Sequence, residues 1–204
     1  SRHQDQNPYT DEDYFAYVDG KPRYNGVRDF FASRGITLPE GDPSDGPAAQ
    51  TICGLGNRKN DLFNTVLARD GIQPYPGSRR WVDRLHESGM AMAVVSSSRN
   101  AAAVLKAAGM VEDFSVLVDG NRSKTERLPG KPAPDTYLRG AELLGVPAEQ
   151  CVVVEDAVSG VRAGAAGGFG MVLGVNRGVG ADRLREAGAD RVVDDLDEMV
   201  EEMA

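Results

Sequence analysis

Three short segments of this sequence place polar side chains at the point where an apolar run ends. The apolar residues 152–154 lead directly into two carboxylates, Glu155 and Asp156, and Ala93–Val95 leads into three hydroxyls that begin with Ser96. A lysine, Lys131, stands in a Gly-Lys-Pro-Ala-Pro segment between these two runs. In an open α/β sheet the carboxyl ends of the strands line the ligand crevice. The residues would then meet at one place, and together they suit a phosphate group with a divalent cation.

The acid pair is the candidate metal site. Mg²⁺ favours carboxylate oxygens and keeps several waters, so one or two protein carboxylates are enough to hold it. Glu155 and Asp156 therefore become the predicted metal ligands, and Mg²⁺ the predicted cofactor. The alternative is structural: two acids at the start of a helix also stabilise its dipole.

Ser96 and Lys131 are the candidate catalytic residues. A hydroxyl and backbone amides at a strand-to-helix junction can receive a phosphoryl oxygen, as helix N-termini do. One of the three serines could instead cap the helix that follows. Prolines on the C-terminal side of Lys131 restrict the backbone and hence the direction of the lysine. An isolated lysine in a loop is otherwise most often a solvated charge.

The elements that must position these residues follow one another regularly from about residue 76 onward. Apolar runs predict strands at 91–95, 114–118, 151–154, 171–175 and 191–193, separated by helical patterns, the first with Ser78 as its N-cap candidate. Alternating strands and helices predict an α/β fold, a Rossmann-like parallel sheet with helices on both faces.

The first part of the chain has a different character. Residues 1–75 are polar and rich in turn formers, with an evident loop at 41–46 and short apolar helical patterns but no strand alternation. We therefore predict a helical cap domain at 1–75 and a Rossmann-like core at 76–204.

Composition narrows the class of protein. The formal charge of the 204 residues is −8 and the pI is about 4.8, which disfavours nucleic acid and anionic membranes as partners. Cys53 and Cys151 are predicted to be reduced thiols, and no apolar stretch of about 18 residues is present. These observations favour a cytoplasmic protein, with a monomer expected.

The three segments, in this order, resemble the second, third and fourth motifs of the haloacid dehalogenase (HAD) superfamily of aspartate-dependent phosphotransferases. The resemblance implies Mg²⁺-dependent transfer through an aspartyl-phosphate, with Ser96 and Lys131 on the phosphate and Glu155 and Asp156 on the metal. The first family motif, Asp-x-Asp-Gly-Thr/Val, which carries the nucleophile, is missing. In the family its strand lies at the centre of the sheet, and we hypothesise about 30 more N-terminal residues that include it.

The predicted cap domain at 1–75 is similar to the cap of the β-phosphoglucomutase-like branch through its Arg-Lys-Asn-Asp segment. The resemblance implies that Arg58 and Lys59 face the substrate, unless they only begin a solvated helix, and that Ser97 and Asn100 also contact it. Arg23 is a further candidate phosphate contact. The expected substrate is a small phosphorylated metabolite, such as a sugar phosphate.

Three other functions are alternatives to phosphoryl transfer. Without a nucleophile the protein could be a non-catalytic phosphate-binding or regulatory protein. The acid pair argues against the metal-free dehalogenases. Gly54-Leu-Gly56 lacks a third glycine and a preceding strand, which argues against a nicotinamide oxidoreductase.

Overall fold

The computed structural model describes residues 7–202. The chain divides into two compact units, the first ending at Gly71 and the second beginning at Ile72. We describe each unit by itself. Within residues 7–202 no helix is both long and apolar enough to span a membrane.

The first unit is helical in its described part. It contains α1 (Asp11–Asp13), the π-helix η1 (Tyr14–Val18), α2 (Arg23–Ser33) and α3 (Ile52–Asp70). Thr10 and Asp13 form a reciprocal capping box at the start of α1, and the Thr51 hydroxyl accepts from the amide of Gly54 at the start of α3. The assignment of this unit as a cap domain stays a prediction.

A buried arginine fastens the beginning of the first unit. The Arg34 guanidinium donates to the Asp13 carboxylate at 2.6 Å and to the carbonyl oxygens of Asn7 and Pro8, at 2.9 Å and 3.3 Å. It also lies over the ring of Phe30 at 5.3 Å. Because Arg34 is only 7% exposed, these partners replace the water molecules that would otherwise hydrate its charge.

The second unit alternates strands and helices. Its elements are α4 (Pro76–Glu87), β1 (Ala93–Val95), α5 (Ala101–Ala107), η2 (Val111–Asp113), β2 (Val116–Val118), α6 (Gly120–Glu126), α7 (Asp135–Leu144), η3 (Ala148–Gln150), β3 (Val152–Glu155), α8 (Val158–Ala166), β4 (Met171–Val175), α9 (Ala181–Glu186), β5 (Arg191–Val193) and α10 (Asp197–Glu202). All the strand pairs are parallel, as β-branched runs connected by helices predict.

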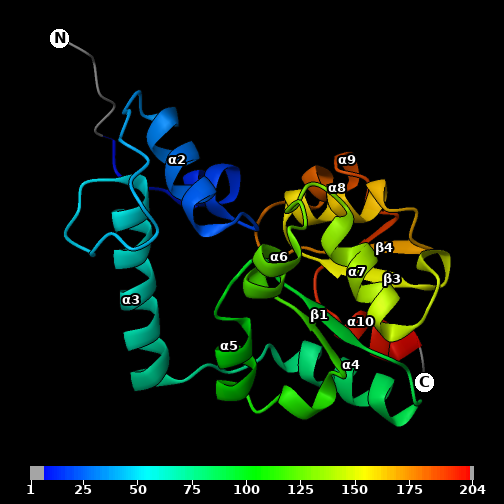
Figure 1. The fold of residues 1–204 in the computed structure, drawn as a ribbon. Coiled ribbons are helices and arrows are strands. Elements are labelled where there is room, and N and C mark those ends of the chain that lie inside the picture. The colour runs from blue at the N-terminus through cyan, green and yellow to red at the C-terminus, as the bar shows by residue number, and fades with distance from the viewer. Residues whose placement is uncertain (1–6, 203–204) are drawn as a thin grey trace. The chain divides into compact units, whose positions relative to one another are not determined.

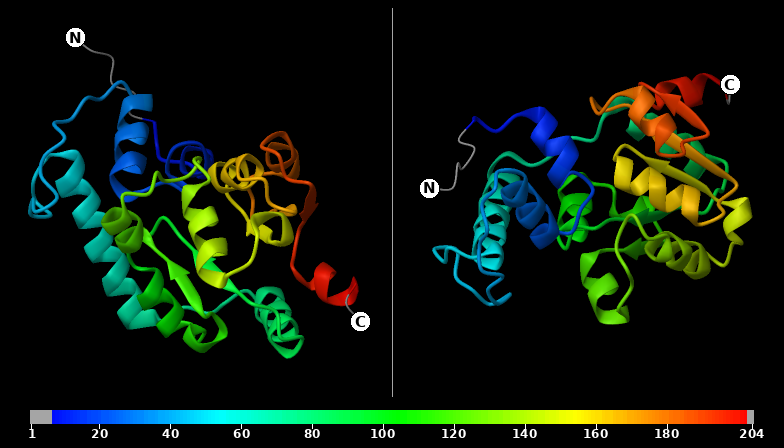
Figure 2. Two further views of the ribbon diagram at one scale, coloured as in Figure 1. Left: turned by 45° about the vertical axis from the view of Figure 1, so that its right-hand side comes forward. Right: turned by 90° about the horizontal axis from the view of Figure 1, so that it is seen from above.

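Helices cover both faces of the sheet β3–β4–β5 (Figure 1, Figure 2). On one face, Gly164 of α8 lies close to Val153 and Val172, and a Cβ at this position would come within 3.1 Å of a methyl group of each valine. On the other, Trp81 of α4 and Met199 of α10 pack against a buried cluster that consists of Leu173, Val175, Val193 and Leu196. The predicted α/β, Rossmann-like fold class is therefore confirmed.

The strands form two sheets instead of one. β1 pairs only with β2, and β3 pairs with β4, which pairs with β5. Within residues 7–202, β1 and β3 therefore each have one unpaired edge. Both strands are incompletely covered: no residue of β1 is buried, and Val152 at the start of β3 is 53% exposed. Most of β4, in contrast, is buried.

Several local predictions need correction. Ser78 is not an N-cap: Pro76 begins α4 two residues earlier, and Ser78 instead accepts a hydrogen bond from Arg177 at 3.1 Å. The first two strands are also shorter than the predicted 91–95 and 114–118, because only Ala93–Val95 and Val116–Val118 pair with each other.

Candidate active site

The side chain of Glu155, the last residue of β3, is the centre of the candidate site. Its oxygen Oε2 accepts hydrogen bonds from Lys131 Nζ at 2.5 Å and from the Tyr137 hydroxyl at 2.6 Å. Its oxygen Oε1 accepts from the backbone amides of Asp156 and Ala157, both at 3.0 Å. A carboxylate has about four acceptor positions, so this one is fully hydrogen-bonded. Only 9% of the side chain is exposed.

Lys131 links the ends of two strands that belong to different sheets. Its ammonium, on a side chain 7% exposed, bonds Glu155 at the end of β3 and also lies 3.4 Å from the carbonyl oxygen of Val95, the last residue of β1. Ser96, which follows Val95, bonds β2 through its amide. Since successive backbone groups alternate in direction along a strand, the Val95 carbonyl lies on the unpaired edge of β1. The lysine thus occupies that edge.

Gly160, in the first turn of α8, makes room for the Glu155 side chain. A Cβ at position 160 would lie 1.9 Å from Glu155 Oε2 and 2.2 Å from its Cδ, far inside contact distance. The absence of a side chain at this position therefore lets the carboxylate lie against the helix, where it meets the amides at the start of α8. The sequence pattern alone did not identify this glycine as part of the site.

The opposite charges of Lys131 and Glu155 stabilise each other. Burial alone would raise the pKa of Glu155, but the Lys131 ammonium and the hydrogen bonds from Lys131, Tyr137 and the Asp156 amide outweigh it and lower the pKa to about 2. Burial, reinforced by the charge of Glu155, raises the pKa of Tyr137. Glu155 is accordingly an anion, and the Tyr137 hydroxyl stays protonated as its donor.

The loop after β1 carries the predicted phosphate residues. Ser96 Oγ accepts from the amide of Ser98 at 3.1 Å, and Ser98 Oγ accepts from the amide of Asn100 at 3.1 Å. These bonds fold the loop into consecutive turns that lead into α5. Ser96 and Ser97 are partly exposed, and Ser96 directly follows the carbonyl that Lys131 contacts.

Asp156 is the more accessible acid of the predicted metal pair, and it is exposed next to the buried Glu155. Among residues 7–202 no group of three or more His, Cys, Asp or Glu side chains is arranged to hold a metal. A cation here would rely on the exposed Asp156 and on water, because hydrogen bonds already fill the acceptor positions of Glu155. That donor set fits Mg²⁺, which binds through one or two carboxylates and keeps several waters.

Three predicted substrate residues lie in the first unit. Arg58 and Lys59 are exposed on α3. Arg23, at the start of α2, donates to Asn60 Oδ1 at 2.5 Å and to Asn57 Oδ1 at 3.3 Å, which joins α2 to α3. Two nitrogens of its guanidinium are thus already used within the unit. The substrate roles of these residues stay predictions.

Sequence reasoning missed two residues near the ends of the strands. Tyr137 is one of them, although a phenol among apolar neighbours often marks a buried hydrogen bond. Asp119 follows β2 as Glu155 ends β3, and its carboxylate caps α6 by accepting from the amides of Asn121 and Arg122, at 3.0 Å and 2.9 Å. The pattern of an acid after an apolar run was therefore present there too.

Comparison with known proteins agrees with this arrangement, in which polar residues meet at the carboxyl ends of parallel strands. A family model of haloacid dehalogenase-like hydrolases matches residues 2–168. The chain is 49% identical over 191 residues to a β-phosphoglucomutase from Mycobacterium bovis, a match that covers 92% of this chain and 73% of the relative. It is 33% identical to hexitol phosphatase A from Escherichia coli, covering 92% of this chain and 77% of the relative.

A solved structure of β-phosphoglucomutase from Clostridium difficile shares the fold, with a TM-score of 0.75, 20% identity, and coverage of 95% of this chain and 81% of that one. The fold and the site thus define the class of protein as an α/β enzyme whose polar site lies at the carboxyl ends of its parallel strands. The chain belongs to the haloacid dehalogenase-like hydrolase family. The superfamily membership and the β-phosphoglucomutase-like branch, both inferred from the motifs, are confirmed.

Proposed function

We propose that this protein serves Mg²⁺-dependent phosphoryl transfer on a small phosphate monoester, and that the substrate is a sugar phosphate. The observation that carries the proposal is the buried Lys131–Glu155 pair, whose ammonium contacts the carbonyl of Val95 at the end of β1, directly before Ser96 in the chain. The relatives support the substrate class, because one is a β-phosphoglucomutase and another a hexitol phosphatase. In a phosphatase the phosphoryl group passes to water, and in a mutase to a sugar hydroxyl.

Each residue of the site has a distinct role in this proposal. Ser96 and the amides of its loop receive a phosphoryl oxygen, and the Lys131 ammonium offsets the charge of the phosphoryl group. Glu155 holds Lys131 in place through their hydrogen bond. Asp156 would hold Mg²⁺, which when bound neutralises charge on the phosphate, and the hydrogen-bonded Glu155 would add negative charge beside it. Ser97, Asn100, Arg23, Arg58 and Lys59 are the proposed substrate contacts.

The attacking carboxylate is proposed to come from a strand seated between β1 and β3. The Asp-x-Asp motif of the family does not occur at the end of an apolar strand in the 204 residues. Within residues 7–202, β1 and β3 each have an unpaired edge that could accept such a strand. If no strand is supplied, the same site would bind phosphate without turnover, and this non-catalytic role is the second candidate function.

Replacing Asp156 tests the metal site. Asp156→Asn removes the exposed acid at nearly constant shape. Loss of a residue that only hydrogen-bonds a metal ligand costs about 10- to 100-fold in metal affinity. We expect the loss of Mg²⁺ affinity in Asp156→Asn, measured by calorimetry, to be larger than this. Mg²⁺-dependent hydrolysis of a phosphate monoester should be lost with it.

The matched control is Asp182→Asn, which removes an acid whose side chain is 92% exposed and pairs only with Arg185 on the surface of α9. This variant should bind Mg²⁺ as the unmodified protein does. An Asp156→Asn protein with unchanged Mg²⁺ affinity would contradict the metal assignment. Mg²⁺ binding without any turnover would favour the non-catalytic role.

A further inference from the structure

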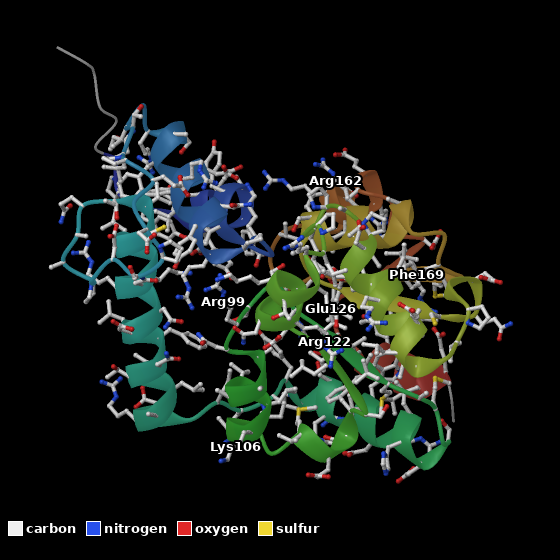
Figure 3. The ribbon with its side chains drawn as sticks, in the orientation of Figure 1. Arg99, Lys106, Arg122, Glu126, Arg162 and Phe169 are labelled. Atoms are coloured by element: carbon white, nitrogen blue, oxygen red, sulfur yellow. The ribbon has the colours of Figure 1, made fainter. Side chains whose placement is uncertain are left out.

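Tyr137 contacts both members of the Lys131–Glu155 pair. Its hydroxyl donates to Glu155 Oε2 at 2.6 Å, and its ring lies beneath Lys131 Nζ, with the nitrogen 4.6 Å from the ring centroid. The residue is 7% exposed in the first turn of α7. The ring of Phe169 meets it edge-on, with centroids 6.0 Å apart and an interplanar angle of 75°. Phe169, in the segment between α8 and β4, is labelled in Figure 3.

The hydroxyl and the ammonium share one oxygen atom. Glu155 Oε2 has two donors, Lys131 and Tyr137, whereas Oε1 is occupied by backbone amides. Because Oε2 also accepts from the tyrosine, the lysine is not its only donor. The aromatic face stabilises the ammonium from a second direction. Glu155 and the ring of Tyr137 together fix the position of Nζ and therefore the direction of its remaining N–H groups.

We propose that Tyr137 is a positioning residue of the phosphate site, acting on phosphate through Lys131. Without the hydroxyl, Glu155 Oε2 would have one acceptor position unfilled, and the carboxylate could turn and carry the ammonium with it, away from a phosphoryl oxygen. The inference rests on the proposed function, because it concerns the same lysine. It adds a residue that neither the sequence motifs nor the acid pair includes.

A double-mutant cycle tests this coupling. The dissociation constant for inorganic phosphate is measured in the presence of Mg²⁺ for Tyr137→Phe, Lys131→Met and the double variant. We expect Lys131→Met to weaken binding about tenfold or more and Tyr137→Phe about three- to tenfold, as for a hydrogen bond to a charged group. If Tyr137 acts through Lys131, the double variant should bind phosphate within about twofold of Lys131→Met alone. If the fold-losses of phosphate affinity in the two single variants multiply in the double variant, the proposal is overturned.

Two control variants separate positioning from packing. Ser33→Ala also removes a hydroxyl that donates a hydrogen bond, to the carbonyl oxygen of Phe30 at 2.7 Å, but in the first unit, and should leave phosphate binding unchanged. Phe169→Leu loosens the packing around Tyr137 and leaves its hydroxyl in place. It should lower the melting temperature and keep the phosphate affinity within about twofold. An equal loss of phosphate affinity in Phe169→Leu and Tyr137→Phe would overturn the positioning role.

Failure of this inference can be told apart from failure of the proposed function. An unmodified protein that does not bind phosphate, or a Lys131→Met variant that binds it unchanged, would contradict the proposed site itself. A clear loss in Lys131→Met with none in Tyr137→Phe would contradict only the inference. If Tyr137→Phe does not fold, NMR of the unmodified protein answers the question. Phosphate should shift the Nζ resonance of Lys131 and the Cζ resonance of Tyr137 together, and a shift of the lysine alone would overturn the proposal.

Discussion

At the scale of single residues, the buried Lys131–Glu155 pair makes stability depend on pH. The pKa of Glu155 falls from 4.5 to about 2 in the folded protein, since the Lys131 ammonium and the hydrogen bonds outweigh the effect of burial. A lowered pKa means that the folded protein binds the proton less readily than the unfolded chain. The stabilisation is therefore complete above about pH 4.5 and is lost as the pH falls toward 2.

Glu155→Gln should show this dependence in urea denaturation without Mg²⁺. The difference in unfolding free energy from the unmodified protein should reach up to about 3 kcal/mol near neutral pH and shrink below about pH 4.5. The control Glu142→Gln removes a carboxylate that is 70% exposed and should change little at any pH. A Glu155→Gln difference that stays constant with pH would mean that the pair does not titrate as described.

At the scale of elements, α8 and β3 meet where Gly160 lies against Glu155. Alanine is ordinarily the better helix residue, by about 1 kcal/mol. At position 160 its Cβ would meet Oε2, Cδ and Cγ of Glu155 at 1.9, 2.2 and 2.4 Å. The carboxylate cannot move aside without losing its four hydrogen bonds. The clash should therefore exceed the helical gain.

We predict that Gly160→Ala lowers the unfolding free energy by about 1–3 kcal/mol, the usual cost of overpacking. It should also weaken phosphate binding, because the carboxylate that holds Lys131 is displaced. Denaturation and calorimetry measure the two effects. Gly46→Ala is the control, since a Cβ there meets nothing within 4 Å. A Gly160→Ala protein more stable than the unmodified one would contradict the close approach.

The elements also show what sequence patterns could and could not predict. Met171–Val175 and Arg191–Val193 have the predicted bounds, because apolar runs define these strands locally. Gly120–Glu126 was not predicted as a helix, since its residues are nearly all polar and the carboxylate of Asp119 starts it. The contact of Tyr137 with Glu155 depends on how α7 packs against the end of β3, and no local pattern encodes that. The motif residues could be found from their types and positions in the sequence. The groups that donate hydrogen bonds to Glu155 could not, because they depend on the packing of the fold.

At the scale of the whole molecule, the division into two units predicts that stability and function can be separated. Arg34→Met would leave Asp13, with a side chain only 15% exposed, without its buried partner in the first unit. Breaking such a pair leaves a charge without its partner and destabilises the fold around it. We expect calorimetry to show a transition at lower temperature, while the Mg²⁺ affinity of the folded protein is unchanged.

Arg28→Met provides the comparison, because its pair with Glu40 is exposed on both sides and should contribute within about 1 kcal/mol. If Arg34→Met weakened Mg²⁺ binding in parallel with stability, the metal site would depend on the first unit, contrary to its placement on residues of the second.

The unpaired edges of β1 and β3 have a practical consequence for handling this protein. Exposed strand edges readily pair with extended chains of other molecules, and natural proteins often protect them with a lysine. Lys131 contacts the Val95 carbonyl only at the end of the β1 edge, whereas Val152 leaves an apolar residue exposed on β3. We therefore expect association at high concentration to begin at the β3 edge, so that preparations kept dilute should resist precipitation longest.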